Sequence, residues 1–296
     1  SLYGFAYETV TVVSMVAFFL LMFLSSLFFG SQKVVTRFYQ SLVLVFGIIF
    51  LFQASRFLFG ADFLSFGNLF TSNVSNLVGK WNDLGIFAGM ITVLSLITLE
   101  TLTLSRMSKI FLYSVLGLSL LALAVVNFLI VWVVVGALAL ILFIYNFSFI
   151  HPVKQNQNSV ASLFLTPSFV VVAVSLIFFI GSSAIGVFVS EKLNISQVEV
   201  RPAWSATGIV LKETIKDRPL LGSGPNRFNA EWLLNKPDVI NNSIFWNTEF
   251  HSGIGLLPTF AVTTGVLGAS ALAVFLALLL YEGIRFLVFS PRPLIF

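Results

Sequence analysis

The amino-acid sequence predicts an all-α membrane protein: a polytopic helical bundle of about seven transmembrane helices with one large extracytoplasmic loop that contains an amphipathic helix. Of its 296 residues, 58% are hydrophobic and 9% are charged, whereas about 25% of a typical soluble domain is charged. Apolar runs of about twenty residues recur along the chain, and each is long enough to cross a hydrocarbon core of about 30 Å. One long polar stretch, 191–256, interrupts them.

Seven apolar segments are predicted to span the bilayer, approximately at 9–29, 39–59, 84–104, 110–127, 128–147, 164–189 and 257–281. Little more than Asn127 separates the fourth segment from the fifth, which predicts a tight helical hairpin. We expect residues 1–296 to form a single membrane domain, in which the 191–256 loop is a subdomain that carries the functional site. Because the chain starts at Ser1 without a recognisable signal sequence, we expect it to be a fragment of a longer membrane protein.

The basic residues of the short loops predict the orientation. They are Lys33 and Arg37, Arg106 and Lys109, Lys154, and Arg285 and Arg292. These residues alternate onto one side of the predicted bundle, and short cytoplasmic loops carry the excess of lysine and arginine. The 60–83 loop and the 191–256 loop are therefore expected outside the cytoplasm.

The first part of the long loop predicts an amphipathic helix. Arg201-Pro202 begins it, because proline is tolerated in a first helical turn. Asp217-Arg218-Pro219 ends it, because the residue before a proline is disfavoured in the right-handed helical region. Its narrow apolar face is predicted to consist of Trp204, Gly208, Leu211 and Ile215. We expect this helix to lie at the outer membrane surface, where tryptophan is favoured at headgroup level.

A glycine-rich element, Pro219-Leu-Leu-Gly-Ser-Gly-Pro225, follows this helix. It lacks the Gly-Lys-Ser/Thr ending of a phosphate-binding loop. Two interpretations of Gly222 and Gly224 remain open. One is a sharp turn, and the other is an anion-binding nest made of successive backbone N–H groups.

Glu249 and His251 precede the last predicted span. If the segment is extended, residues two apart point to the same face, and a histidine beside a carboxylate is suited to act as a general base. The alternative is a solvated loop histidine without a role. The outward-facing basic residues are Lys80, Arg201, Arg218 and Arg227. They fit either a lipid-headgroup contact or the binding of a phosphorylated lipid head, whose oxygens the arginine fork grips in two places.

One set of motifs runs through the loop and into the last span: Arg201-Pro-Ala-Trp204, Pro219-Leu-Leu-Gly-Ser-Gly224, Phe228, His251 and Thr264-Gly265-Val-Leu-Gly268. This set resembles the O-antigen ligase and O-antigen polymerase superfamily of bacterial envelope glycosyltransferases. Lys80-Trp-Asn82, before the third span, is similar to an earlier outside motif of that family.

The resemblance implies a multi-pass protein of the bacterial cytoplasmic (inner) membrane that takes part in cell-envelope polysaccharide biosynthesis. It implies transfer of a glycan from a polyprenyl-diphosphate carrier, such as undecaprenyl diphosphate, to a glycan, lipid or protein acceptor, without metal or other cofactor. By position, Arg201 would contact the donor diphosphate with help from Lys80, Arg218 or Arg227. His251, or Glu249 in its place, would take the proton of the acceptor hydroxyl, and Gly222 and Gly224 would shape the supporting turn.

The remaining sequence features agree with metal-independent chemistry. The four aspartates are scattered and form no Asp-x-Asp pair, and the absence of cysteine excludes thiolate metal ligands. Two alternatives stay open, namely a transporter or flippase of lipid-linked glycans and a non-catalytic membrane protein. Ion-coupled transporters usually carry ionisable residues near the bilayer midplane, whereas Arg56 and Glu100 lie close to the ends of predicted spans.

Overall fold

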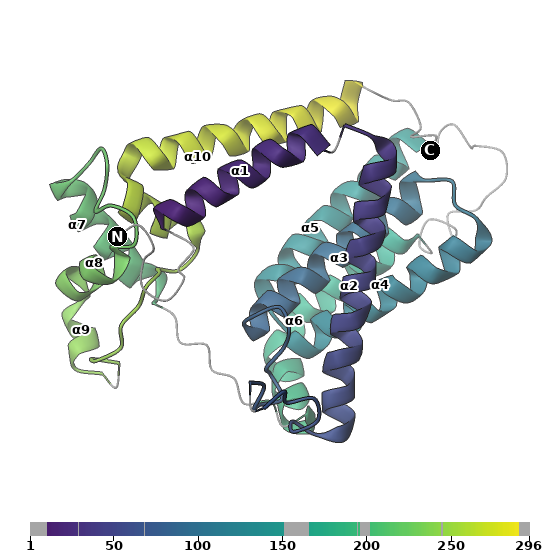
Figure 1. The fold of residues 1–296 in the computed structure, drawn as a ribbon, viewed down its shortest axis with the longest axis horizontal. Helices are drawn as coiled ribbons and strands as arrows, with labels where there is room; N and C mark the ends of the chain where they lie inside the picture. The colour runs from purple at the N-terminus through teal and green to yellow at the C-terminus, as the bar shows by residue number, and fades with distance from the viewer. Residues whose placement is uncertain are drawn as a thin grey trace. The chain divides into compact units, whose positions relative to one another are not determined.

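The computed structural model describes residues 11–28, 30–67, 69–150, 166–193, 195, 202–243 and 245–289. In these ranges all regular secondary structure is helical (Figure 1). The α-helices are α1 (Val12–Phe28), α2 (Gln32–Phe59), α3 (Trp81–Thr101), α4 (Arg106–Val126), α5 (Leu129–Tyr145), α6 (Pro167–Leu193), α7 (Trp204–Asp217), α8 (Phe228–Asn235), α9 (Asp238–Asn241) and α10 (Leu256–Phe289). A short π-helix, Asn146–Ile150, continues α5.

The predicted all-α membrane class is confirmed. Among the described residues, six helices are long and apolar enough to cross a membrane: α2, α3, α4, α5, α6 and α10. Each of the seven apolar segments expected from the sequence contains a helix in its described part, but the 17 described residues of α1 fall short of membrane length. The chain divides into two compact units. One contains residues 33–197 and 292–296, and the other contains residues 1–32 and 198–291.

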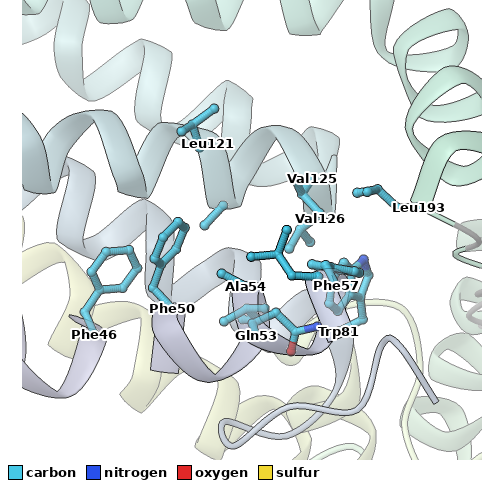
Figure 2. A pocket seen from close by; sticks show the side chains of 13 residues that line it. Phe46, Phe50, Gln53, Ala54, Phe57, Trp81, Leu121, Val125, Val126 and Leu193 are labelled. Carbon is cyan, nitrogen blue, oxygen red and sulfur yellow. The ribbon is translucent and has the colours of Figure 1, made fainter. Parts of the chain in front are cut away.

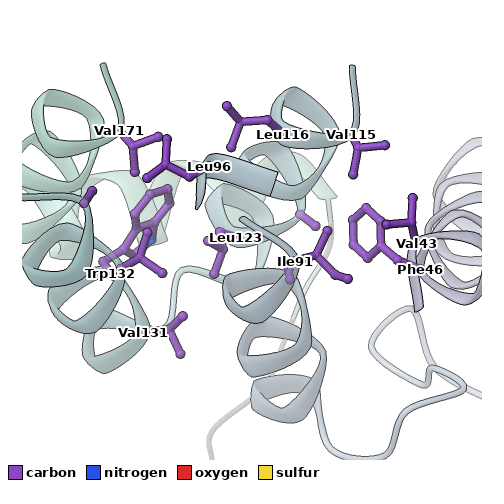
Figure 3. Close-up of a cluster of buried hydrophobic side chains, with 14 residues drawn as sticks. Val43, Phe46, Ile91, Leu96, Val115, Leu116, Leu123, Val131, Trp132 and Val171 are labelled. Atoms are coloured by element: carbon purple, nitrogen blue, oxygen red, sulfur yellow. The ribbon is translucent and has the colours of Figure 1, made fainter. Parts of the chain in front are cut away.

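The unit with α2 to α6 has a continuous hydrophobic core (Figure 3). Trp132 of α5 is fully buried and stacks on Phe178 of α6 with ring centroids 4.2 Å apart. Small residues let these helices approach closely, as is usual in membrane bundles. A methyl group built on Gly136 of α5 would lie 2.8 Å from the Cβ of Ser175 on α6.

The predicted tight turn at Asn127 is present, but the predicted hairpin packing is not: α4 and α5 each pack mainly against other helices, α4 on α3 and α5 on α6 and α3. Asn127 adopts a left-handed conformation with φ 49° and ψ 45°; α4 ends at Val126 and α5 begins at Leu129. Asparagine tolerates this conformation better than most residues. The side-chain Nδ2 of Asn127 donates a hydrogen bond of 2.7 Å to the carbonyl of Ser182 on α6, which connects the turn to that helix.

A buried arginine organises the 60–80 segment that leads to α3. Arg56 is fully buried near the end of α2, and its two terminal nitrogens donate hydrogen bonds of 2.8–3.0 Å to backbone carbonyls of that segment. The four accepting residues are Ala61, Phe70, Ser72 and Ser75. The guanidinium also lies over the rings of Phe52 and Phe70. One side chain therefore satisfies carbonyls that would otherwise be buried without partners.

Candidate functional site in the polar loop

Helix α7 ends where the sequence predicts and begins slightly later. It starts at Trp204, two residues after Pro202, and ends at Asp217. Arg218, the residue before Pro219, has φ −137° and ψ 70° and has left the helical region. The steric effect of a proline on the preceding residue is local, which explains why the sequence was sufficient to place this end.

The face of α7 that packs inside its unit is not the predicted apolar face, and the membrane contact expected of that apolar face stays a prediction. The buried residues are Ala206, Thr207, Val210 and Thr214. Trp204 is 65% exposed and Gly208 is also exposed, while Leu211 and Ile215 are only partly covered. The buried stripe is displaced around the helix from the expected one, toward smaller and more polar side chains.

The neighbours of α7 explain this difference. Ala206 and Val210 form a compact cluster with Phe228 and Trp232 of α8 and Val262 of α10. The two large aromatic side chains of α8 require small residues opposite them. The buried threonine Thr207 accepts a hydrogen bond of 3.0 Å from the backbone N–H of Ile254, so its hydroxyl is satisfied inside the unit. Packing partners, rather than hydrophobicity, select the buried face.

The glycine-rich turn after α7 is hydrogen bonded into a break in α10. At Gly265 the backbone of α10 has φ 67° and ψ −165°, so the regular helical bonds are interrupted there. On one side of the break, the carbonyls of Val262 and Thr263 accept from the N–H groups of Ser223 and Gly224, each at 2.9 Å.

On the other side of the break, the N–H groups of Val266 and Leu267 donate to the carbonyls of Pro219 and Leu220, at 2.9 and 3.2 Å. A broken helix is tolerated at membrane depth only where protein groups satisfy its backbone. The turn supplies four such bonds.

These bonds decide between the two interpretations of the turn. The N–H of Gly222 donates to the carbonyl of Arg218 at 3.1 Å, and those of Ser223 and Gly224 donate to α10. An anion nest needs these N–H groups to point at a ligand. The nest is therefore wrong and the sharp turn is confirmed. Gly222 and Gly224 have φ of 62° and 99°, in the left-handed region that favours glycine.

Arg218 and Arg227 stand at the two ends of this turn. Both side chains are exposed. Arg218 is the C-cap of α7, and Arg227 is the N-cap of α8. The Cδ of Arg227 lies 3.8 Å from a methyl group built on Gly224. A turn fixed to a membrane-length helix thus carries one guanidinium on each side.

Three side chains along one face of α8 hold the segment that leads to His251. Asn229 Nδ2 donates to Glu249 Oε2 at 3.1 Å, and Trp232 Nε1 donates to the carbonyl of Thr248 at 3.3 Å. Lys236 Nζ donates to the carbonyl of Trp246 at 2.6 Å. The ring of Trp232 also meets that of Phe250 edge to face, with centroids 4.9 Å apart. We call these three side chains the α8 clamp.

The segment is fixed again directly after His251. Gly253 is buried, and a methyl group there would collide with Thr207 of α7 and Phe228 of α8. Its N–H donates to Thr259 Oγ1 of α10 at 3.0 Å. His251 therefore lies exposed on a short segment that is held from α8 on one side and from α7 and α10 on the other.

The structure places part of the predicted residue set in one compact unit. Arg218, Arg227, Glu249 and His251 all belong to the unit with α7 to α10, and all four are exposed. Lys80 belongs to the other unit, where it is the exposed N-cap of α3, and its N–H donates to Asp83 Oδ2 at 2.9 Å. Arg201 lies outside the described residues.

Sequence reasoning missed α8 and its clamp. The signal was present in FNAEWLLN, where Phe228 and Trp232 are spaced four apart and fall on one helical face. The function of Gly253 as a contact point had no local signal, because the residues that it meets lie far away in the sequence.

A largely apolar cavity of about 330 Å³ lies in the other unit, between α2, α3, α4 and the end of α6 (Figure 2). Its lining residues are Phe46, Phe50, Gln53, Ala54, Phe57, Leu58, Trp81, Leu84, Leu121, Ala122, Val125, Val126 and Leu193. An apolar cavity of about 150 Å³ is already large enough to bind benzene. This cavity therefore has room for a considerably larger apolar group.

The described residues contain no group of three or more histidine, aspartate or glutamate side chains arranged to hold a metal ion. The prediction of a cofactor-independent site stays a prediction.

Comparisons with protein-family models, with curated proteins and with solved structures give no match for this chain. The proposed function therefore depends on the residues and their geometry, together with the resemblance of the motifs.

Proposed function

We propose that the protein is a membrane glycosyltransferase similar to O-antigen ligases and polymerases. It transfers a glycan from a polyprenyl-diphosphate carrier, such as undecaprenyl diphosphate, to an acceptor hydroxyl at the outer face of the bacterial cytoplasmic membrane, without metal. The observation that carries the proposal is the pair of exposed guanidinium groups, Arg218 and Arg227, at the two ends of a turn that is bonded into α10.

The chemistry of the donor explains why this pair matters. Cleavage of the sugar–phosphate bond leaves a multiply charged lipid diphosphate, which needs fixed positive charge as it forms. Arginine grips phosphate oxygens through two N–H groups at once. Because the carrier is a lipid, its diphosphate lies at the membrane surface. A turn that is attached to a membrane-length helix supports two guanidinium groups close to that surface. By resemblance, Arg201 also belongs to this set.

The segment that the α8 clamp holds, which contains Glu249 and His251, activates the acceptor. The acceptor oxygen attacks the anomeric carbon, the bond to the diphosphate breaks, and the acceptor proton passes to His251 Nδ1 or Nε2, or to Glu249. A general base must be kept within hydrogen-bond reach of the proton that it removes. The contacts before and after His251 limit its backbone in this way.

The apolar cavity of the other unit suits a lipid hydrocarbon chain. Its lining is almost entirely apolar, and it lies among membrane-length helices. Arg56 and Glu100, which a transporter would need as movable charges, are engaged in structural contacts. Arg56 binds loop carbonyls, and Glu100 accepts from the Ser168 N–H at 2.6 Å and from the side chain of Asn146. These contacts favour the glycosyltransferase over ion-coupled transport.

The proposal is tested with the purified chain in proteoliposomes. The probe is undecaprenyl-diphosphate-linked N-acetylglucosamine, supplied with bacterial membrane lipids as acceptor, and the readout is release of undecaprenyl diphosphate. We expect wild-type protein to release it, and both Arg201→Ala and His251→Ala to lose nearly all release while remaining in the membrane. Normal release by both variants would overturn the assignment.

The expected orientation has its own test. The chain lacks cysteine, so a cysteine at Asn242, an exposed residue just after α9, reports one position. We expect an impermeant maleimide to label it from outside intact cells. Labelling only after the cells are permeabilised would place the loop in the cytoplasm, which is incompatible with this function.

A further inference from the structure

The position of Gly265 along α10 indicates how deep in the membrane the Pro219–Gly224 turn lies, because this turn is bonded to α10 around Gly265. Leu256 begins α10, and Gly265 follows nine residues later, about 14 Å along the helix at 1.5 Å per residue. Between Leu256 and Tyr281 the helix has no charged residue. The first charge is Glu282, which lies exposed and pairs with Arg285 at 3.5 Å.

Glu282 sets a limit on this depth from the opposite side. Seventeen residues separate it from Gly265, about 26 Å of helix, whereas the hydrocarbon core is about 30 Å thick. If Glu282 stands at one edge of the core, Gly265 lies about 4 Å inside the other edge. Tilting of the helix moves Gly265 deeper. With Leu256 at the edge instead, the depth reaches about 14 Å. Both limits place Gly265 within hydrocarbon.

Helix α7 runs from the level of Leu256, the start of α10, to the level of the break at Gly265. A methyl group built on Gly255, directly before α10, would lie 3.8 Å from Cη2 of Trp204, the first residue of α7. Its last turn leads into the residues that bond to α10 around Gly265. The start of α7 is thus level with the start of α10, where a tryptophan suits the interface, and its end is level with the break.

The side chains at the tip of the turn are apolar and uncovered. Leu220 is 60% exposed and Leu221 is 72% exposed, although their neighbours Gly222 and Ser223 are buried against α10. We propose that Pro219–Gly224 is a re-entrant membrane element, with Leu220 and Leu221 in contact with the hydrocarbon chains of the bilayer. The occupant of this surface is the lipid itself, because the turn is bonded to a membrane-length helix at a level where lipid is the surrounding solvent.

The polar groups nearby are compatible with this placement. The backbone N–H groups of Gly222, Ser223 and Gly224 are satisfied by protein carbonyls, which lipid-exposed backbone requires. The charged residues beside the turn restrict it to the shallow end of this depth range. Lys216, Asp217, Arg218 and Arg227 are all exposed, and from a shallow position the long side chains of lysine and arginine reach back to the headgroups. The C-terminal end of α7 therefore reaches the edge of the hydrocarbon core, while its charged side chains stay at headgroup level. This inference does not depend on the proposed function.

Single cysteines test the inference, since the chain has none of its own. Leu221→Cys, and Leu220→Cys as a second position, are labelled with the polarity-sensitive dye NBD, and the protein is placed in nanodiscs of phosphatidylethanolamine and phosphatidylglycerol. Val274→Cys, 58% exposed on α10, is the lipid-facing reference. Asn242→Cys is the water-facing reference, because α9 lies at the end of its unit remote from α10 (Figure 1).

We expect the dye at Leu221 and Leu220 to emit at the short wavelength seen at Val274. Lipids with a nitroxide high on the acyl chain should quench it several-fold more strongly than the dye at Asn242. Emission and quenching like those at Asn242 at both positions would overturn the inference. Blue-shifted emission without nitroxide quenching would also overturn it, because it would show that protein, rather than lipid, covers the turn.

Discussion

Gly222 and Gly265 face each other through their backbones, with no room for a side chain on either. A methyl group built on Gly222 would lie 2.5 Å from the backbone nitrogen of Gly265, and one built on Gly265 would lie 2.5 Å from the backbone nitrogen of Gly222. The contact joins a loop to a membrane-length helix 43 residues later in the chain. It is what allows the four backbone hydrogen bonds between the turn and α10 to form.

Gly265→Ala is expected to destabilise the unit with α7 to α10. Its φ of 67° and ψ of −165° lie in a region that is almost exclusive to glycine, and a side chain there costs about 1–3 kcal/mol before the collision with Gly222 is added. The measurement is the melting temperature in detergent. Gly208→Ala on α7 is the control, because nothing lies within 4 Å of the added methyl group. An unchanged melting temperature for Gly265→Ala would contradict the contact.

Removal of either arginine at the turn is expected to weaken transfer. Arg218→Ala or Arg227→Ala loses charge-assisted hydrogen bonds to the diphosphate, and we expect kcat/KM to fall on the order of 10- to 100-fold. Arg218→Lys should recover only part of it, since an ammonium lacks the fork. Lys216→Ala, an exposed cation that pairs with Glu213 at 3.5 Å, is the control. If Arg218→Ala and Arg227→Ala were as active as the control Lys216→Ala, the turn would not be part of the site.

The α8 clamp is expected to act through His251 rather than through folding alone. Trp232→Phe keeps a ring against Phe250 but loses the hydrogen bond to the Thr248 carbonyl. We expect kcat to fall while KM for the donor stays unchanged, because the diphosphate-binding arginines are not touched. Trp246→Phe is the matched control, since its side chain is 60% exposed and Lys236 bonds only to its backbone carbonyl. A rise in KM with constant kcat would speak against a positioning role.

Arg56 is expected to be essential for the 60–80 segment. Arg56→Met leaves four carbonyls without their donor, and unsatisfied buried groups cost about 1–3 kcal/mol each. We expect a lower melting temperature and faster hydrogen exchange in residues 61–75. Arg37→Met, at an exposed position of the same helix, should change neither. Unchanged exchange in the Arg56 variant would show that the arginine does not order the segment.

Metal removal is expected to have no effect on transfer. The chain has no Asp-x-Asp pair and no cysteine, and fixed guanidinium groups are assigned the role that a divalent ion plays in metal-dependent transfer. The measurement is release of undecaprenyl diphosphate in EDTA. Loss of release that Mg²⁺ or Mn²⁺ restores would contradict the assignment, while an Arg201→Ala variant measured in parallel gives the level of an inactive site.

The sequence alone determined the features that depend on neighbouring residues. Apolar runs located the helices because burial in lipid requires about twenty consecutive apolar residues, whatever packs around them. Pro219 determined the end of α7, and Asn127 the turn between α4 and α5, because both effects are steric and local. Arg218, Arg227, Glu249 and His251 were identified by their chemical type and their place in a polar loop.

Only the tertiary structure decided the features that depend on distant partners. The face of α7 that packs inside its unit follows from Phe228 and Trp232 of α8, which the periodicity of α7 alone did not reveal. The Pro219–Gly224 turn is not an anion nest, because the N–H groups of Ser223 and Gly224 donate to carbonyls at the break in α10. Arg56 changed from a charge near a span end to the anchor of a loop. In each case the physical reason is the same: a polar group or a glycine takes its role from the atoms that face it, and residues far away in the chain supply those atoms.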